Sequence, residues 1–276
     1  MNRCVSIALA ALTAGTMTMG LGCGTAEASC ASVFGFGNSA QCTSSPTTIA
    51  VALGSGASAR AEGGLGAALA LGDGAFAGAF GWFGSATALG NGSKAVATSL
   101  GLALSAGPGA DTHAGAAPTE VLNLAVSIGS SNAEALGVGN VALNLFGGGS
   151  EVLSFGNGNA ALNTGDQSFV HAFGTFSSAS NLGTYNAFVT TTPQGTANSV
   201  LSVLGSNNKV QAGDGPLALA GALFTSNQLL LKSGPGININ GVTAGGAAAT
   251  PPATATGAKH TAAKGLAGSK RKPAAK

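Results

Sequence analysis

The chain has 276 residues, of which 46 are glycine, 45% are apolar and only 7% are charged. Much of the apolar fraction is alanine. Alanine and glycine bury little surface each, so we do not expect a soluble intracellular enzyme with a core of large side chains. The low charge also argues against charge-driven disorder. The composition suits a scaffold in which stacked strands satisfy one another's backbone hydrogen bonds.

Residues 1–28 have the pattern of a secretory signal peptide. Arg3 supplies a positive charge, the stretch 5–19 is apolar, and residues 26–28 form an A-x-A cleavage site. We therefore expect cleavage after residue 28 and a secreted or cell-surface protein. The alternatives are a lipoprotein acylated at Cys23 and a permanent transmembrane helix, for which the apolar run is short.

Residues 29–48 follow this cleavage site and contain two cysteines, Cys30 and Cys42. An even number of cysteines in an oxidising compartment predicts one disulfide, which here closes a short loop in an N-terminal cap. Two free thiols are the alternative. The segment lacks a C-x-x-C redox motif, and two cysteines alone do not make a structural zinc site.

The segment 49–100 carries a nine-residue repeat of the form A-x-A-x-G. Its marker glycines are Gly54, Gly63, Gly72, Gly81 and Gly90. Alternation with a period of two is typical of a strand with one packed face, and a glycine at the strand end permits a sharp bend. Leu65 and Phe83 stand two residues after alternate markers, where the other markers have glycine. The sequence therefore predicts an all-β fold, a parallel β-solenoid or β-roll with nine-residue half-turns and eighteen-residue turns.

The nine-residue period fails over 101–124, and we expect an insertion there. Glycine and proline at 107–109 and a further proline, Pro118, punctuate the segment in the manner of turns and loops. The residues from Pro118 to Leu124 have the pattern of a short helix start.

The segment 125–243 is expected to form a second solenoid block and a cap. Its marker glycines are Gly147, Gly156, Gly165, Gly174 and Gly183. Three pairs of larger side chains stand eighteen residues apart: Val152 and Val170, Phe155 and Phe173, and Asn163 and Asn181. These pairs predict side-chain ladders on successive turns, in which stacked asparagines hydrogen-bond to one another. We expect Phe188 to continue the lattice of the two valines, and 217–231 to form terminal turns or a cap.

The segment 244–276 begins as an extended linker rich in alanine, threonine and proline. We expect it to end in a disordered basic tail, whose cations are Lys259, Lys264, Lys270, Arg271, Lys272 and Lys276. Residues 29–256 carry four basic and eight acidic side chains, a net charge of −4, whereas residues 257–276 carry +6. The tail is expected to bind polyanions, and a purely solubilising end is the alternative.

The segment 51–59, Val-Ala-Leu-Gly-Ser-Gly-Ala-Ser-Ala, and its echoes at 70–75 and 87–93 resemble the head repeats of trimeric autotransporter adhesins. The resemblance covers residues 49–98 well and 125–190 loosely. It implies a left-handed parallel β-roll and a role in surface attachment. The chain also resembles secreted Gly/Ala-rich repeat proteins of mycobacteria in its signal peptide, repeats, linker and Lys/Ala tail.

Several residue patterns resemble cofactor-binding or calcium-binding motifs. The motif G-x-G-x-x-A begins at Gly54, Gly72, Gly90, Gly137 and Gly156. One copy would suggest a dinucleotide-binding loop, but five copies within a repeat are better explained by the turns of the repeat. The aspartates Asp73, Asp166 and Asp214 are too sparse for calcium-binding nonapeptides. We expect no cofactor and no metal.

The histidines and carboxylates offer few catalytic arrangements. His113 stands two residues after Asp111 in the expected insertion, and the motifs H-E-x-x-H and G-x-S-x-G are absent. We expect His113 to be solvated and His171 to point outward, opposite to its inward neighbour. If the chain were a glycosidase, Glu134 and Glu151 would be the best candidates for its pair of catalytic carboxylates.

The sequence predicts a secreted, non-catalytic surface or structural protein that is adhesive or attached to the envelope through its basic tail. Its expected partners are anionic glycans, envelope polymers or host matrix, and a second copy of the chain; the tail lacks aromatic residues, so specific nucleic-acid binding is not expected. The alternative is a solenoid enzyme or carbohydrate-processing protein with Asp111 and His113 at its site near 101–120. Ice binding is a weaker alternative because a regular threonine ladder is absent.

Overall fold

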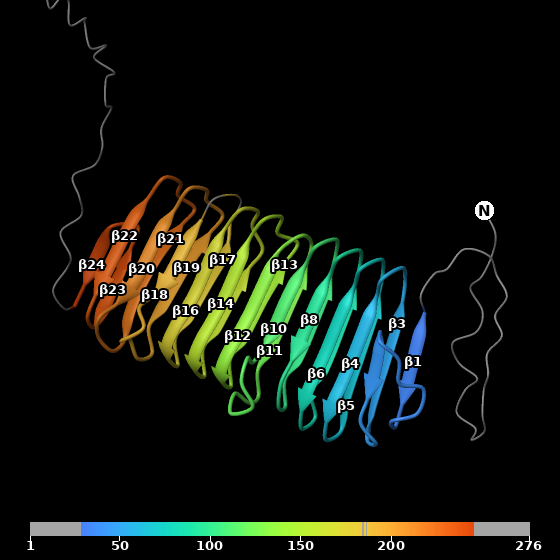
Figure 1. Ribbon diagram of the computed structural model, residues 1–276. Coiled ribbons are helices and arrows are strands. Elements are labelled where there is room, and N and C mark those ends of the chain that lie inside the picture. Colours follow the sequence, from blue (N-terminus) through green and yellow to red (C-terminus); the bar gives the residue numbers. More distant parts are fainter. Residues whose placement is uncertain (1–28, 184, 186, 246–276) are drawn as a thin grey trace, which may run out of the picture.

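The computed structural model describes residues 29–183, 185 and 187–245. The expected signal peptide at 1–28 and nearly all of the expected linker and tail lie outside the described residues. The described chain consists of strands and their connections, which confirms the predicted all-β class. In Figure 1 the strands lie side by side in chain order, from β1 at one end of an elongated body to β24 at the other.

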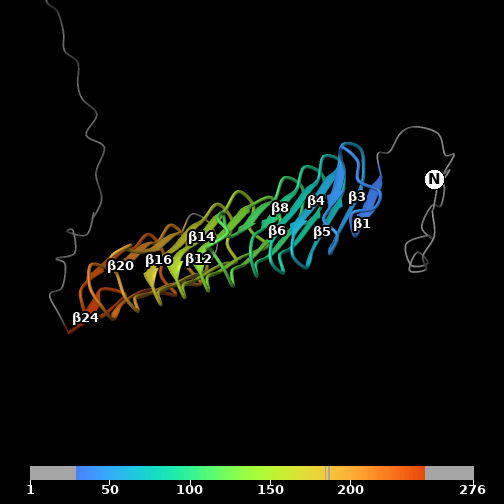
Figure 2. The same cartoon turned by 60° about the horizontal axis from the view of Figure 1, so that its bottom comes forward.

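The strands belong to two sheets that face each other, and each turn of the chain adds one strand to each sheet (Figure 2). The first sheet contains β1 (Cys30–Val33), β3 (Thr48–Leu53), β5 (Gly66–Leu71), β7 (Ser85–Leu89), β9 (Leu102–Ala106), β11 (Leu124–Ile128), β13 (Val141–Leu145), β15 (Ala160–Asn163), β17 (Ser178–Leu182), β19 (Ser199–Val203), β21 (Ala218–Leu223), β23 (Gly236–Ile239) and β24 (Val242–Ala244). The second sheet contains β2 (Cys42–Ser44), β4 (Ser58–Gly63), β6 (Phe76–Gly81), β8 (Lys94–Ala97), β10 (Asp111–Ala114), β12 (Asn132–Val138), β14 (Glu151–Asn157), β16 (Phe169–Thr175), β18 (Phe188–Thr191), β20 (Lys209–Gly213) and β22 (Leu229–Ser233). Neighbouring strands are parallel except at the two ends of the first sheet, so the predicted parallel β-solenoid is confirmed.

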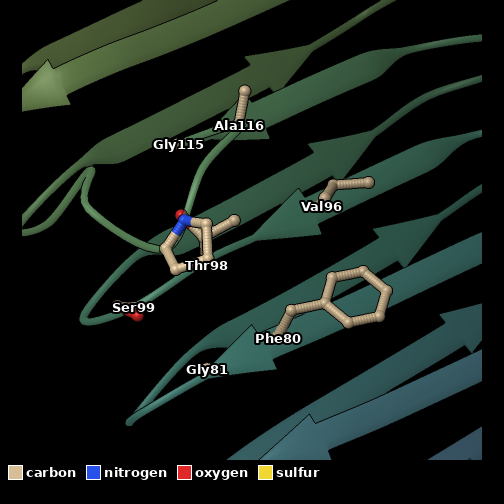
Figure 3. Close-up of a pocket in the computed structure, with 8 residues that line it drawn as sticks. Phe80, Gly81, Val96, Thr98, Ser99, Gly115 and Ala116 are labelled. Carbon is tan, nitrogen blue, oxygen red and sulfur yellow. The ribbon is translucent and has the colours of Figure 1, made fainter.

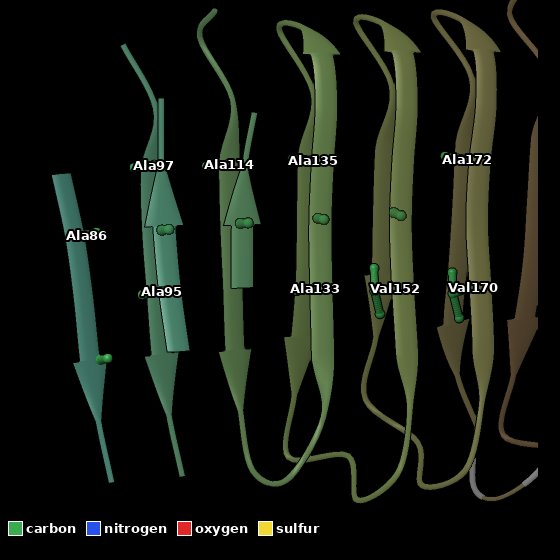
Figure 4. Packing of buried hydrophobic residues seen from close by; sticks show 14 of the residues in the cluster. Ala86, Ala95, Ala97, Ala114, Ala133, Ala135, Val152, Val170 and Ala172 are labelled. Atoms are coloured by element: carbon green, nitrogen blue, oxygen red, sulfur yellow. The ribbon is translucent and has the colours of Figure 1, made fainter. Parts of the chain in front are cut away.

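In the first turns, alanine fills the space between the two sheets. Both alanines of each A-x-A unit point inward and are at most 2% exposed: Ala50, Ala52, Ala59, Ala61, Ala68, Ala70, Ala77, Ala79, Ala86 and Ala88. Figure 4 shows such inward side chains on successive strands, with Ala133 and Ala135 followed by Val152 and Val170. Protein interiors are close-packed, so the small volume of alanine sets how closely the sheets approach.

The register between turns keeps inward positions in line. Ala52 pairs with Ala70 on the next strand of its sheet, and Ala70 with Ala88. Turn length nevertheless varies, since Ser85 pairs with Leu102 and Leu102 with Leu124. The differences in length lie in the connections, so every strand keeps the same alternation of inward and outward faces.

The expected ladders of larger side chains are confirmed, with one correction. Val152 pairs with Val170 and Phe155 with Phe173. Phe188, however, does not continue the valine lattice, because Val170 pairs with Val189 while Phe169 pairs with Phe188. One extra residue in this turn moves the valine position to 189 and places Phe188 on the outer face.

The expected insertion at 101–124 is wrong over most of its length, because β9 and β10 continue the two sheets without a break. The glycines at 107 and 109 donate ladder bonds to Leu89 and Asn91, so the proline between them removes none. Within 101–124, only the connection 115–123 is longer than the corresponding connections of the neighbouring turns, and it contains no helix. The two predicted blocks are therefore one continuous solenoid, and β21 and β22 are regular turns of it.

Antiparallel strands close both ends of the first sheet. At the N-terminal end β1 runs antiparallel to β3, and the predicted disulfide is confirmed between Cys30 and Cys42, whose Cα atoms lie 5.8 Å apart. This disulfide joins the first strand of one sheet to the first strand of the other. At the C-terminal end β24 folds back antiparallel on β23. Such end strands cover edges that would otherwise be open for pairing.

A row of buried asparagines runs along the inside of the first sheet. Asn163 Nδ2 donates to Asn144 Oδ1 at 3.0 Å, and Asn181 Nδ2 donates to Asn163 Oδ1 at 2.8 Å. All three side chains are fully buried. The predicted asparagine ladder is therefore confirmed, and the structure extends it to Asn144.

A second asparagine row, which the sequence interpretation missed, lies where the second sheet passes the chain to the first. Asn123 Oδ1 accepts from the Asn140 amide at 3.0 Å, Asn140 Oδ1 from Asn159 at 2.9 Å, and Asn159 Oδ1 from Ser177 at 2.7 Å. The same side chains donate to carbonyl groups, such as Asn159 Nδ2 to Gly174. They satisfy backbone groups at corners where the strand ladder stops.

Replacing Asn163 tests the buried ladder. Asn163→Ala leaves Asn144 Oδ1 and Asn181 Nδ2 without this partner in a buried site, so we expect the free energy of unfolding to fall by roughly 2–4 kcal/mol. Urea denaturation followed by circular dichroism measures the change. Asn132→Ala is the matched control, since its exposed side chain should contribute less than about 0.5 kcal/mol. Equal effects from both variants would contradict the ladder's role.

Two glycines of one corner provide a second test. Gly72 has φ of +126°, and an added Cβ would lie 2.6 Å from the Gly90 carbonyl carbon, whereas Gly74 has φ of +66° and nothing within 4 Å of an added Cβ. Gly74→Ala should lower the free energy of unfolding only by the strain of an alanine in the left-handed backbone conformation, about 1–2 kcal/mol. Gly72→Ala adds a backbone clash, so we expect a clearly larger loss, about 3 kcal/mol or more. Urea midpoints of the two variants decide between this order and the reverse.

Candidate functional site

Among the described residues, charged side chains occur only in the second sheet and in the connections. None of the described strands of the first sheet contains Asp, Glu, Lys, Arg or His. The second sheet carries Arg60, Glu62, Lys94, Asp111, His113, Glu134, Glu151, His171, Lys209 and Lys232. All but Lys232 lie at outward positions, which makes the outer face of the second sheet the candidate functional site.

Three titratable side chains meet on β10 and β12. His113 Nε2 lies 3.4 Å from Asp111 Oδ1, and its Nδ1 lies 3.9 Å from Glu134 Oε1. His113 and Glu134 are directly paired in the register. The side chains are partly exposed, so solvent screens their attraction. The structure thus places His113 on a strand rather than in the expected insertion.

A second group, the aromatic patch, consists of Phe155, Phe169, His171, Phe173 and Phe188 on β14, β16 and β18. The His171 ring lies 5.5 Å from Phe173 and 6.4 Å from both Phe169 and Phe188, centroid to centroid. Phe155 and Phe173 meet edge to face at 6.4 Å. The outward direction predicted for His171 is confirmed, since the neighbouring Val170 is fully buried while the imidazole lies among the exposed rings.

Polar groups border the aromatic patch on two sides. His171 Nε2 lies 3.2 Å from Glu151 Oε1, and Lys209 Nζ lies 5.4 Å from the centre of the Phe188 ring. Aromatic rings with a charged neighbour can pack against the flat apolar face of a ligand while the charge contacts its polar edge. The patch is therefore suited to binding a surface rather than to enclosing a small molecule.

A cavity of about 340 Å³ lies beside the long connection 115–123, but it does not include the titratable trio. Its lining residues are Phe80, Gly81, Val96, Thr98, Ser99, Gly115, Ala116 and Pro118, seven of which are labelled in Figure 3. None of these residues has an ionisable side chain. Asp111 and His113, the residues expected for an enzyme, stand on the open sheet face instead.

The remaining carboxylates of the sequence analysis have separate surroundings. Glu134 and Glu151 lie on neighbouring strands but out of register, and each is close to a different histidine. Asp73 Oδ1 accepts from the Ser55 amide at 2.9 Å and so ties one corner to the next. The glycines of the repeated G-x-G-x-x-A motif form these stacked corners: Gly72 donates to Leu53 and Gly90 to Leu71.

Asp166 has the same role as Asp73 in a later corner, where its Oδ1 accepts from the Gly148 amide at 2.7 Å. Asp214 is an exposed corner residue near the C-terminal end. The six cations of the tail, Lys259, Lys264, Lys270, Arg271, Lys272 and Lys276, and the third histidine, His260, lie outside the described residues.

Lys232 is a charged residue that the sequence interpretation missed. It points inward from β22, the last strand of the second sheet, and is only 2% exposed. Its Nζ donates to the Ser233 carbonyl at 3.2 Å, and no carboxylate of the described chain lies within ion-pair distance. Inward and outward side chains alternate along 229–233, and this alternation in the sequence would have indicated that Lys232 points inward. Inward charges on end strands discourage further pairing.

No protein-family model, no curated protein and no solved structure matches this chain. Among the described residues there is no helix of the length and apolar character needed to cross a membrane. In the same part of the chain, no three His, Cys, Asp or Glu side chains are grouped so that they could hold a metal ion.

Replacing Lys232 tests its role at the end of the second sheet. Lys232→Leu removes a buried charge, so we expect the free energy of unfolding to rise by roughly 1–2 kcal/mol. The uncharged end strand should at the same time promote end-to-end association, seen as slow growth in light scattering. Lys209→Leu on the outer face of β20 is the control and should change neither quantity. A destabilised Lys232→Leu that stays monodisperse would contradict this interpretation.

Proposed function

We propose that this chain is a secreted, non-catalytic surface or structural protein. In this proposal the solenoid is a rigid adhesive body, and the basic tail attaches it to anionic glycans, envelope polymers or host matrix. Surface attachment is also what the resemblance to adhesin head repeats implies.

The proposal rests on one observation: the titratable and aromatic side chains lie on an open sheet face and not in a cavity. The titratable trio and the aromatic patch both lie on the open outer face of the second sheet, away from the cavity beside 115–123, whose lining has no ionisable side chain. A smaller hollow of about 170 Å³ is lined by Asp214 and Lys232 but includes neither group. Catalytic groups usually lie in a concave site that excludes water. An open face with aromatic and charged side chains is better suited to contact with an extended polymer or surface.

The distribution of charge along the chain supports the basic tail as the point of attachment, or tether. The chain up to residue 256 carries −4 and residues 257–276 carry +6, so the two parts differ in sign. A polyanion would be repelled by the acidic body and attracted by the tail. The attraction between exposed charges falls with salt, because the screening length is about 10 Å at 0.1 M ionic strength.

Heparin-column retention of the full chain tests this tether. We expect retention at low salt that is lost as the salt concentration rises, and no retention of a chain that ends at residue 256. A variant of full length with all six tail cations replaced by glutamine should behave like the truncated chain. Lys94→Gln with Lys209→Gln, which changes only cations of the body, is the matched control and should be retained. Retention of the truncated chain would contradict the tether.

A further inference from the structure

The outer face of the first sheet is mostly aliphatic from β3 to β23. Its outward polar side chains are Ser85, Thr87, Ser178, Ser180 and Ser199. Its central column begins with Val51, Leu69, Thr87, Leu104, Val126 and Leu143, each directly paired with the next in the register. The columns on either side are also mostly Leu, Ile, Val and Ala, with a few serines. We call these outward residues of β3 to β23 the aliphatic face.

The aliphatic face contains no charge, and this separates it from the opposite side of the body. All charged residues of the described strands are in the second sheet. Several residues at the borders of the face are strongly exposed, among them Leu53 at 46% and Leu102 at 46%. The solvent-facing side of a sheet is normally mostly polar, whereas on this side Leu, Ile, Val and Ala outnumber the few serines and the one threonine.

The size of the aliphatic face exceeds what a monomer normally exposes. Eleven strands from β3 to β23 at about 4.8 Å, each presenting about 15 Å of width, give an area on the order of 750 Å². Monomeric proteins rarely expose contiguous apolar patches larger than a few hundred Å². An area of about 800 Å² per partner is what a stable protein–protein interface of standard size buries.

We propose that the aliphatic face binds the aliphatic face of a second copy of this chain, so that the protein is a face-to-face dimer. The face is periodic, so the ridges of one copy meet grooves of the same spacing in the other, as in two packed sheets. β13 is the middle strand of the run from β3 to β23. A two-fold axis near Leu143 therefore places the whole aliphatic face of one copy against that of the other.

The lack of charge on the aliphatic face also favours a second copy of the chain over a lipid surface as the partner of this face. Membrane-bound faces carry Lys or Arg for the headgroups and Trp at the interface. The aliphatic face has neither, and the single tryptophan, Trp82, lies in the connection between β6 and β7. An uncharged aliphatic partner of matching shape is what a second copy supplies.

Sedimentation equilibrium of the full chain tests the dimer. We expect the wild type to be dimeric at micromolar concentration and Leu143→Lys to raise the dimer dissociation constant by at least about 100-fold, because two lysines would be buried next to the axis. Leu153→Lys is the matched control. It makes the same change at the central column of the second sheet, between Glu134 and His171, and should leave the dissociation constant within about threefold of the wild type.

A second variant guards against loss of folding. Thr87 is already polar, so Thr87→Arg should leave the fold and the circular dichroism spectrum unchanged. In the proposed dimer β7 faces β19 of the second copy, so the arginine should make the dimer dissociate. A monomeric wild type at about 100 µM would overturn the proposal. So would a folded Leu143→Lys or Thr87→Arg that remains dimeric. Binding of a monomeric wild type to uncharged phosphatidylcholine vesicles would likewise overturn it and assign the face to lipid.

Discussion

The distance between the two sheets is the constraint on which the rest of the structure depends. The interior accepts alanine in the early turns and valine in some later ones, and all of these side chains are buried. The two sheets are therefore close together, and small side chains fill most of the space between them. The larger side chains that do point inward, such as Asn163 and Lys232, are held by hydrogen bonds. The two outer faces carry the aromatic and aliphatic groups and nearly all of the charged groups of the described strands.

The same constraint explains why the fold was predictable from the sequence. Most inward positions of the early turns hold alanine, so the A-x-A-x-G period is visible wherever the connections have constant length. Between Ser85 and Leu102 one turn is a residue shorter, and the next is several residues longer. A fixed period fails at such places although the strands continue, and this is why the insertion expected at 101–124 is wrong. The corner row of asparagines was missed for the same reason, since Asn123, Asn140 and Asn159 are unevenly spaced.

The candidate site was predictable only in part. Its residues come together laterally, across turns of different length, so Glu151 and His171 meet although they stand 20 residues apart. The pair Phe155 and Phe173 was visible at the regular spacing, whereas the position of Phe188 depended on one extra residue in its turn. The separation of charged from uncharged faces becomes apparent only after alternate strands are assigned to opposite sheets, because within the sequence the two kinds of strand simply alternate.

The direction of the backbone hydrogen bonds has a mechanical consequence. The bonds between turns run along the axis of the body, and the described chain enters at β1 and leaves at β24, at opposite ends (Figure 1). Tension applied through the two ends of the chain would load the outermost turn first and peel turns away one at a time, rather than shear a whole sheet. The disulfide between Cys30 and Cys42 stands where such peeling would begin at one end. The covalent link therefore protects the turn that tension would reach first, and the opposite end, closed only by the β23–β24 hairpin, would be the one to yield.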